Sequence, residues 1–466
     1  MHGLSHRSKT RTAPKTLAFW TAVLLPIPVF FQISEGEINL ATPSPSTSLP
    51  PVPISILLLI PILFYLCRRL NLLRRLARHN SGIRSLSVIF CLLVALSLLA
   101  SAQAIENTLL ILQWAVPIIW AFYGALLALF YHRDAENFAL GLVLGIAAAA
   151  IYLCLGVTSD LGHFLAHGRI DPIDPPISGM YQLGNYTPAG LVTAGLLMLA
   201  LKPGLQGPIN ISANVAGVAA LLMSLLFLGS RETLLSIAIL LLALLFHRTR
   251  GRRRPVVLLA TVMLGFGLAY GAYVASDGTS YEIGSFARTI KTLRGEDASA
   301  GPDASRIEAY IGGRAKFARV RGLDKIVSEV GLSGSLINFT NPYGELGRSF
   351  GRQSTHNIYL ELLLNFGVIG IGIISVLWFL WIPAGLRALR AVPQERSLSP
   401  FSLGMSVLLT LGLSGNLRLS IAQPYSGFLF YVTLGMLFIS LMQLSSRNRL
   451  PRRPKTTLGA KGNADP

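Results

Sequence analysis

Long apolar runs, separated by short polar and basic segments, dominate the chain. The runs are 15 to 27 residues long and nearly free of charge, and about 20 apolar residues in a helix cross the hydrocarbon core of a bilayer. The pattern therefore predicts an all-α, polytopic membrane protein with about twelve transmembrane helices. They are expected at residues 17–33, 53–67, 85–103, 107–131, 137–156, 184–201, 211–229, 232–246, 255–275, 357–383, 399–415 and 423–443.

The composition agrees with membrane insertion. Of 466 residues, 52% are hydrophobic and 13% are charged, whereas about 25% are charged in an ordinary soluble domain. A net charge of +19 would suggest nucleic acid as the partner of a soluble protein, but cytoplasmic loops enriched in Lys and Arg give the same excess. We expect membrane lipids as partners and no nucleic acid.

The positions of the basic residues predict the topology. With the N-terminus in the cytoplasm, 26 of the 40 Lys and Arg residues are cytoplasmic, 11 lie in one long loop and three lie in other outer connections. Short cytoplasmic loops are rich in Lys and Arg, while long translocated domains are exempt from this rule. We expect a cytoplasmic N-terminus at 1–16, helices one to nine over 17–275, a large periplasmic loop at 276–355, helices ten to twelve over 356–443 and a basic cytoplasmic tail at 444–466.

Two further expectations concern the chain's processing and its thiols. The first apolar run follows basic residues, as in a secretory signal, but lacks a clear small-residue cleavage site, so we expect an uncleaved membrane anchor. Cys67, Cys91 and Cys154 all fall inside apolar runs. We therefore expect no disulfide.

Four polar features are predicted to share the outer face. Arg231 lies between the seventh and eighth expected helices, Arg306 lies in the long loop, His356 precedes the tenth helix and Arg418 lies in a short outer turn. Polar and charged residues at span ends are expensive to place, and they are frequently functional. For Arg231 a simple turn explains the sequence equally well.

The long loop carries a basic cluster around Arg306. Arg314, Lys316, Arg319 and Arg321 follow within a segment that is expected to form an amphipathic helix. Together they can form a cationic cover for a diphosphate or a lipid headgroup, because Arg binds phosphate oxygens in a bidentate manner. A basic face turned to solvent or headgroups is the simpler interpretation of any one of them, and which loop Arg contacts a phosphate stays open.

The segment THNIYLELLLNFGVIG, residues 355–370, is the most informative in the chain. It places His356 and Asn357 at the outer mouth of the tenth helix, with Glu361 one to two turns further along. A His followed by a carboxylate at membrane depth suggests proton transfer. Gly367 and Gly370 are expected to let a neighbouring helix approach closely.

This segment resembles the signature of the O-antigen ligase and polymerase superfamily, whose members carry a His-Asn, an aromatic-Leu pair and two glycines in this arrangement. Three weaker matches accompany it: LFLGSRETLLSIAILLL around Arg231, SRIEAY around Arg306 and GNYTPAG near residue 185. The resemblance spans residues 184–370. It implies a GT-C-like fold in a bacterial inner membrane, with the N- and C-termini in the cytoplasm.

The resemblance also implies a reaction. A glycan would pass from an undecaprenyl-diphosphate carrier to an acceptor hydroxyl, on lipid A core or another glycan, without a metal or other cofactor. Arg231 and Arg306, with Arg418 at the same face, would stabilise the charge that develops on the diphosphate leaving group. His356 would orient or deprotonate the attacking hydroxyl, and Glu361 would hold the imidazole tautomer. The expected enzyme is a metal-independent membrane glycosyltransferase of the ligase type.

Two alternatives remain open at this stage. A polymerase of the same superfamily would join repeat units on the carrier instead of moving a finished glycan. A non-enzymatic glycolipid transporter or flippase would instead show polar residues along the midplane of several spans and inverted repeats, whereas the polar groups here gather at one face.

Overall fold

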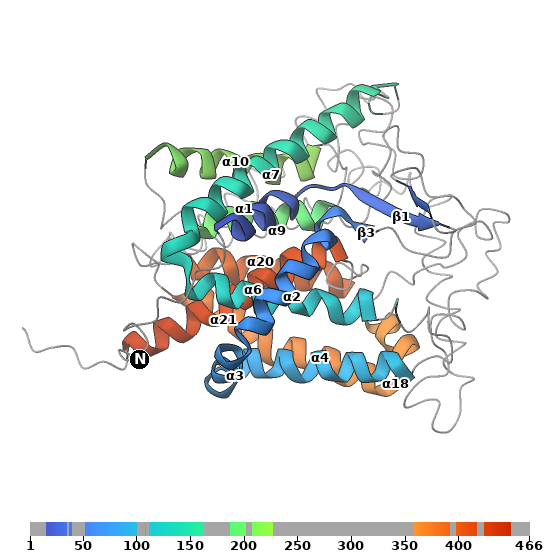
Figure 1. The fold of residues 1–466 in the computed structure, drawn as a ribbon, viewed down its shortest axis with the longest axis vertical. Helices are drawn as coiled ribbons and strands as arrows, with labels where there is room; N and C mark the ends of the chain where they lie inside the picture. The colour runs from blue at the N-terminus through green and yellow to red at the C-terminus, as the bar shows by residue number, and fades with distance from the viewer. Residues whose placement is uncertain are drawn as a thin grey trace, which may run out of the picture.

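The computed structural model describes residues 15–34, 37–39, 52–99, 108, 111–159, 161–162, 164, 187–201, 207–226, 358–391, 398–416 and 424–448. This part of the chain is mainly α-helical, as the apolar runs predict. Most of its helices have roughly parallel axes and lie side by side in a bundle (Figure 1). The coarse class, a helical membrane protein, is confirmed.

The elements keep the labels of Figure 1. The α-helices are α1 (Lys15–Leu24), α2 (Leu59–Arg68), α3 (Leu70–His79), α4 (Ser81–Leu99), α6 (Val116–Leu129), α7 (Tyr131–Ser159), α9 (Thr187–Leu201), α10 (Gly207–Leu226), α18 (Ile358–Val376), α19 (Ile382–Arg390), α20 (Pro400–Asn416) and α21 (Pro424–Asn448). Three short helical segments of other kinds adjoin them. η2 (Ile54–Leu58) is a 3₁₀-helix, and η3 (Ile111–Ala115) and η6 (Leu377–Trp381) are π-helices.

Four of the described helices are long and apolar enough to cross a membrane: α4, α7, α10 and α21. A fifth span is possible if η2 and α2 are joined to α3, although the chain bends by 74° between them. α6 and α9 are apolar but shorter. Each of these helices overlaps an expected span, although α6 starts nine residues later than the expected 107 and α7 six residues earlier than the expected 137. The expected spans at 232–246 and 255–275 lie outside the described residues.

The first expected span, residues 17–33, is wrong in its second half. α1 ends at Leu24, and Phe30–Ser34 form strand β1. Pro26 and Pro28 explain the break, because proline lacks an amide hydrogen and disfavours helix in the residue before it. β1 pairs antiparallel with β2 (Glu37–Asn39) and with β3 (Val52–Pro53), in the strand order β2-β1-β3.

The centre of the bundle is the pair α6 and α21. In the most apolar 18-residue stretch of α21, within Tyr425–Ser446, 78% of the residues are buried inside the protein, against 33% of Gly207–Ser224 in α10. The ring of Trp120 stacks on that of Phe428 with centroids 4.5 Å apart. Glycines let the two backbones meet: a methyl group at Gly124 would overlap the backbone of Val432, and one at Gly435 would overlap that of Ala121.

Close backbone contacts at glycines also join other helices. In α7, Gly141 faces the backbone of Phe19 and Gly145 faces that of Val23, so that α7 packs closely along α1. Small residues at such contacts are typical of membrane helices, because van der Waals packing rather than the hydrophobic effect holds helices together in lipid. Buried hydroxyls such as that of Thr433, which donates to the Leu429 carbonyl at 2.8 Å, satisfy themselves within their own helix.

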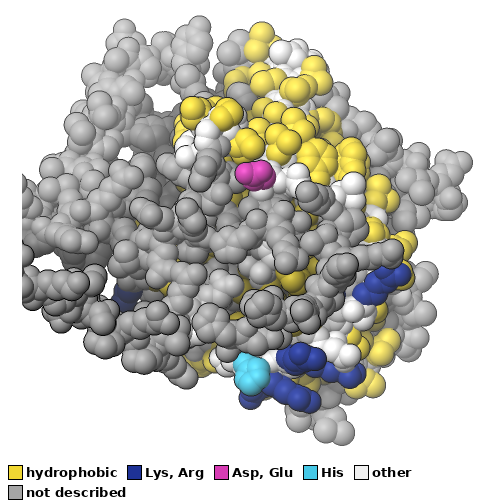
Figure 2. Space-filling model, turned by 60° about the vertical axis from the view of Figure 1, so that its left-hand side comes forward, with side chains coloured by type: hydrophobic (Ala, Val, Ile, Leu, Met, Phe, Trp, Pro, Cys, Tyr) yellow, Lys and Arg dark blue, Asp and Glu magenta, His cyan; other side chains and the backbone are white. Residues whose placement is uncertain are grey.

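The outer surface of the bundle is apolar. Ile60 in α2 is 79% exposed, Ile151 in α7 is 63% exposed and Phe379 in η6 is 78% exposed. Figure 2 shows hydrophobic side chains covering much of the visible described surface. Large exposed apolar areas of this kind suit contact with lipid. Cys67, Cys91 and Cys154 are free and exposed.

The contact between α6 and α21 gives a test of this packing. Replacing Gly435 by Leu should lower the thermal unfolding midpoint of the detergent-solubilised protein, because overpacking a close helix contact costs about 1–3 kcal/mol or more. Gly372→Leu is the matched control, since no atom lies within 4 Å of where its Cβ would stand. Equal midpoints for the two variants would show that the close α6–α21 contact is absent.

Candidate functional site

The residues predicted to carry chemistry fall mainly outside the described part of the chain. Arg231, Arg306, His356 and Arg418 are all outside it, and Glu361 is described only as a backbone position in α18. Their roles therefore remain predictions. The described helices next to them in sequence do show where the chain enters and leaves these segments.

The two ends of the bundle can be told apart by contacts between helix termini. At one end, the Tyr425 hydroxyl at the start of α21 donates a hydrogen bond of 2.9 Å to the Pro26 carbonyl just beyond α1. Gly190 near the start of α9 lies against the ring of the same Tyr425. We call this the Tyr425 end, and it includes β1, on the right in Figure 1.

The opposite end contains α3. There the Asn80 side chain donates to the Phe438 carbonyl of α21 at 3.1 Å, and the Ser399 amide just before α20 donates to the Ala200 carbonyl at the end of α9 at 2.8 Å. We call this the α3 end, and α3 lies toward the left in Figure 1.

Three helix termini that are adjacent in sequence to candidate residues lie toward the Tyr425 end. α20 starts at the α3 end and runs away from it, so its last residue, Asn416, two positions before Arg418, lies toward the Tyr425 end. α10 runs antiparallel to α9, with Gly217 against Gly195 and Leu199. It therefore also ends toward the Tyr425 end, at Leu226, five positions before Arg231.

The third terminus is the start of α18, at Ile358 directly after His356 and Asn357. The ring of Phe366 in α18 makes an edge contact with the ring of Trp114 in η3, with centroids 6.0 Å apart. η3 leads into the start of α6, which lies beside the start of α21 through Trp120 and Phe428. The first part of α18 is thus placed at the Tyr425 end as well.

α18 is not the straight span that residues 357–383 predict. Gly367 has φ 63° and ψ −152°, a conformation essentially restricted to glycine, and the helix breaks there. Gly370 then lies against the backbone of Leu362, eight residues earlier in the same element. The close approach expected at Gly370 is therefore made by its own chain and not by a neighbouring helix.

The break changes how Glu361 relates to the membrane. A straight helix would carry Glu361 deeper along the path of the following residues, but residues 358–366 are a separate short helix. Leu362 and Phe366 of this short helix are buried, at 2% and 0% exposure. His356 and Glu361 are therefore both attached to a packed segment that ends at the break.

Charge separates the two ends of the bundle. Among the described side chains the arginines are Arg68, Arg69, Arg74, Arg75, Arg78, Arg84, Arg387 and Arg390. All belong to the α3 end: six lie on or beside α3, and the last two flank Ala388, which packs against Gly404 near the start of α20. No described arginine lies at the Tyr425 end.

An aromatic group at the Tyr425 end was not predicted from the sequence. Trp114, Trp120 and Phe366 are buried there with Phe428 and Tyr425. Apolar periodicity gives no signal for such a group, because every face of these runs is apolar. Only the helix arrangement shows which of the aromatic residues meet.

The described residues hold no group of three His, Cys, Asp or Glu side chains that could bind a metal ion. The prediction of a metal-independent site depends on residues beyond them and stays a prediction. In comparisons with known proteins, no family model matches the chain and no curated protein matches it.

The break at Gly367 can be tested directly. Gly367→Ala should lower the unfolding free energy by about 1–3 kcal/mol, because an L-residue is strained in this conformation. Gly372→Ala, further along α18 in open space, should be neutral or stabilising by up to about 1 kcal/mol. Thermal unfolding in detergent measures both, and a Gly367→Ala protein as stable as Gly372→Ala would mean that the helix does not need the break.

Proposed function

We propose that the chain is a membrane glycosyltransferase of the O-antigen ligase type, with about twelve spans and a GT-C-like fold. It transfers a glycan from an undecaprenyl-diphosphate carrier to an acceptor hydroxyl, on lipid A core or another glycan, at the periplasmic face of a bacterial inner membrane. The resemblance of residues 355–370 to that superfamily supports this assignment of chemistry.

The orientation is supported by the distribution of charge. Arginines near the ends of spanning helices favour the cytoplasmic side, and the described arginines gather at the α3 end. The α3 end is then cytoplasmic and the Tyr425 end periplasmic. This is the observation that carries the proposal, because the helix termini leading to Arg231, His356 and Arg418 point to the Tyr425 end.

The chemistry requires groups from separate parts of the chain to meet at that face. Cleavage of the bond between sugar and diphosphate leaves negative charge on the phosphate oxygens. Fixed guanidinium groups of Arg231, Arg306 and Arg418 stabilise that charge where water is scarce. The His356 imidazole, in its neutral form, accepts the proton of the attacking hydroxyl.

The packing of the short helix 358–366 supports the proposed role of His356. Its buried residues Leu362 and Phe366 anchor it, and Phe366 packs against Trp114. A base must stand within hydrogen-bond reach of the proton that it removes. We propose that this packed helix, which begins two residues after His356, helps to position the imidazole, and that Glu361 on the same helix is its partner.

Single substitutions test these roles. His356→Ala and Arg231→Ala should each lower glycan transfer by about 10²–10⁴-fold, the usual contribution of a general base or of a preorganised charge. The assay uses the reconstituted full-length protein with a lipid-linked glycan donor, and membrane levels are measured in parallel.

Arg390→Ala is the matched control, because Arg390 is an exposed arginine at the α3 end. It should leave the transfer rate unchanged. Undiminished turnover in His356→Ala and Arg231→Ala at normal membrane levels would contradict the catalytic assignment. The product separates ligase from polymerase: a finished glycan on the acceptor indicates a ligase, and a longer glycan on the carrier indicates a polymerase.

A further inference from the structure

The chain turns sharply where α2 meets α3. The two segments, Ile54–Arg68 and Leu70–His79, are bent by 74° relative to each other. Before the bend, Ile60 and Phe64 are 79% and 58% exposed, an apolar face suited to lipid. The Arg68 guanidinium lies 4.1 Å from the centroid of the Phe64 ring. The bend therefore lies at the boundary between the exposed apolar surface of α2 and the arginines that begin at Arg68.

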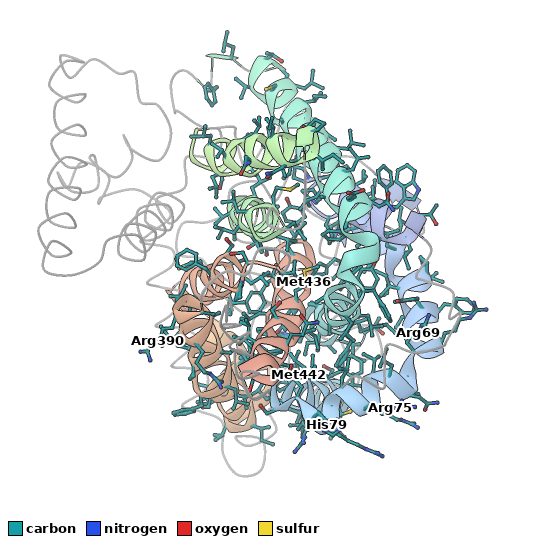
Figure 3. The ribbon with its side chains drawn as sticks, turned by 90° about the vertical axis from the view of Figure 1, so that its left-hand side faces the viewer. Arg69, Arg75, His79, Arg390, Met436 and Met442 are labelled. Carbon is teal, nitrogen blue, oxygen red and sulfur yellow. The ribbon has the colours of Figure 1, made fainter. Side chains whose placement is uncertain are left out.

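α3 has two distinct faces. Leu76 is buried, and Leu72, Leu73 and Ala77 pack against the core. Its other face presents charged or ionisable side chains, all exposed: Arg74, Arg75, Arg78 and His79. Figure 2 shows several basic side chains beside a histidine near the lower edge of the visible face, and Figure 3 shows Arg75 and His79 projecting outward from the bundle. A helix with this division suits the boundary between lipid and water.

The exposed cations of α3 have no acidic residue close to them in the sequence. The sequence contains no Asp or Glu between Glu37 and Glu106. Within the described part of the chain, Arg74, Arg75 and Arg78 make no side-chain hydrogen bond or ion pair. Three guanidinium groups within five residues repel one another, and external negative charge would relieve that repulsion.

The position of α3 is fixed by its neighbours rather than by these cations. Arg84 of α4 donates hydrogen bonds to the Ala77 and Arg78 carbonyls at 3.1 and 2.7 Å, which caps the end of α3. Asn80 accepts a hydrogen bond from the Ile83 amide at 3.1 Å and donates one to the Phe438 carbonyl. Arg74 and Arg78 are therefore presented on a helix that is already held in place.

We propose that α3 is a binding site for anionic phospholipids, whose headgroup phosphates contact Arg74, Arg75 and Arg78 in the leaflet beside the α3 end. Guanidinium groups bind phosphate oxygens in a bidentate manner. The apolar face of α2 next to the bend contacts the acyl chains of the same lipids. This site is at the opposite end of the bundle from the proposed transfer site and does not depend on that function.

Lipid titration followed by native mass spectrometry of the full-length protein tests the site. The probes are phosphatidylglycerol and phosphatidylcholine with identical acyl chains. The wild-type protein should bind phosphatidylglycerol more tightly. The double variant Arg74→Gln and Arg78→Gln should weaken phosphatidylglycerol binding by about 10- to 30-fold and leave phosphatidylcholine binding unchanged.

The matched control removes the same charge elsewhere at the same end, by Arg387→Gln and Arg390→Gln, and it should keep the preference for phosphatidylglycerol. Arg74→Lys with Arg78→Lys should retain most of it. If the glutamine variant loses its folded elution profile, Arg75→Gln alone provides the comparison, with a smaller loss expected. Equal loss in the α3 and control variants, no lipid preference in the wild type, or α3-dependent binding of a short RNA in place of lipid would each overturn the proposal.

Discussion

A guanidinium group at the centre of a spanning helix costs about 2.5–3.5 kcal/mol on insertion scales, and this cost organises the bundle. The described arginines lie on or beside α3, in the first turn of α4 and in the second half of α19, and all of them lie at the α3 end. The termini that lead to the candidate residues lie at the other end. The assignment of a periplasmic face, and with it the proposed chemistry, depends on that separation of charge.

Close packing of backbones supplies the rigidity that the separation requires. Gly124 and Gly435 bring α6 and α21 together, and the stacked rings of Trp120 and Phe428 fill the space beside them. The same helices hold both ends of the molecule. The start of α21 bonds to the chain beyond α1 through Tyr425, and its later turns bond to Asn80 next to α3.

The two proposed sites use this framework in different ways. α3 is held by hydrogen bonds from Arg84 and Asn80, so that its exposed arginines project away from the bundle, where the proposal places lipid headgroups. At the other end, the break at Gly367 makes a separate short helix of residues 358–366, and its contact with Trp114 fixes the segment that follows His356.

Much of the helical arrangement could be predicted from the sequence, because a long uncharged run has few alternatives to a spanning helix. α4, α7, α10 and α21 agree with expected spans on this basis. The first span was wrong beyond Leu24, since the apolar run 17–33 outweighed Pro26 and Pro28 in the prediction. The break at Gly367 was missed because glycine in a membrane helix more often serves close packing.

The candidate site shows a different limit. Motif resemblance selected Arg231, Arg306, His356 and Arg418, but their positions relative to one another depend on contacts between distant parts of the chain. The edge contact of Trp114 with Phe366 is an example, since neither residue's neighbours in sequence indicate the pairing. What the described helices contribute is the direction in which three of those segments leave the bundle.

The side of the membrane on which residue 355 lies is the most direct test of the central claim. In a chain with Cys67, Cys91 and Cys154 replaced by Ala, a single cysteine is introduced as Thr355→Cys or, for comparison, as Arg78→Cys. A membrane-impermeant maleimide added to intact cells should label Thr355→Cys, whereas Arg78→Cys should react only after permeabilisation. Labelling of Arg78→Cys in intact cells, with Thr355→Cys protected until permeabilisation, would contradict the orientation and remove the basis for a periplasmic transfer site.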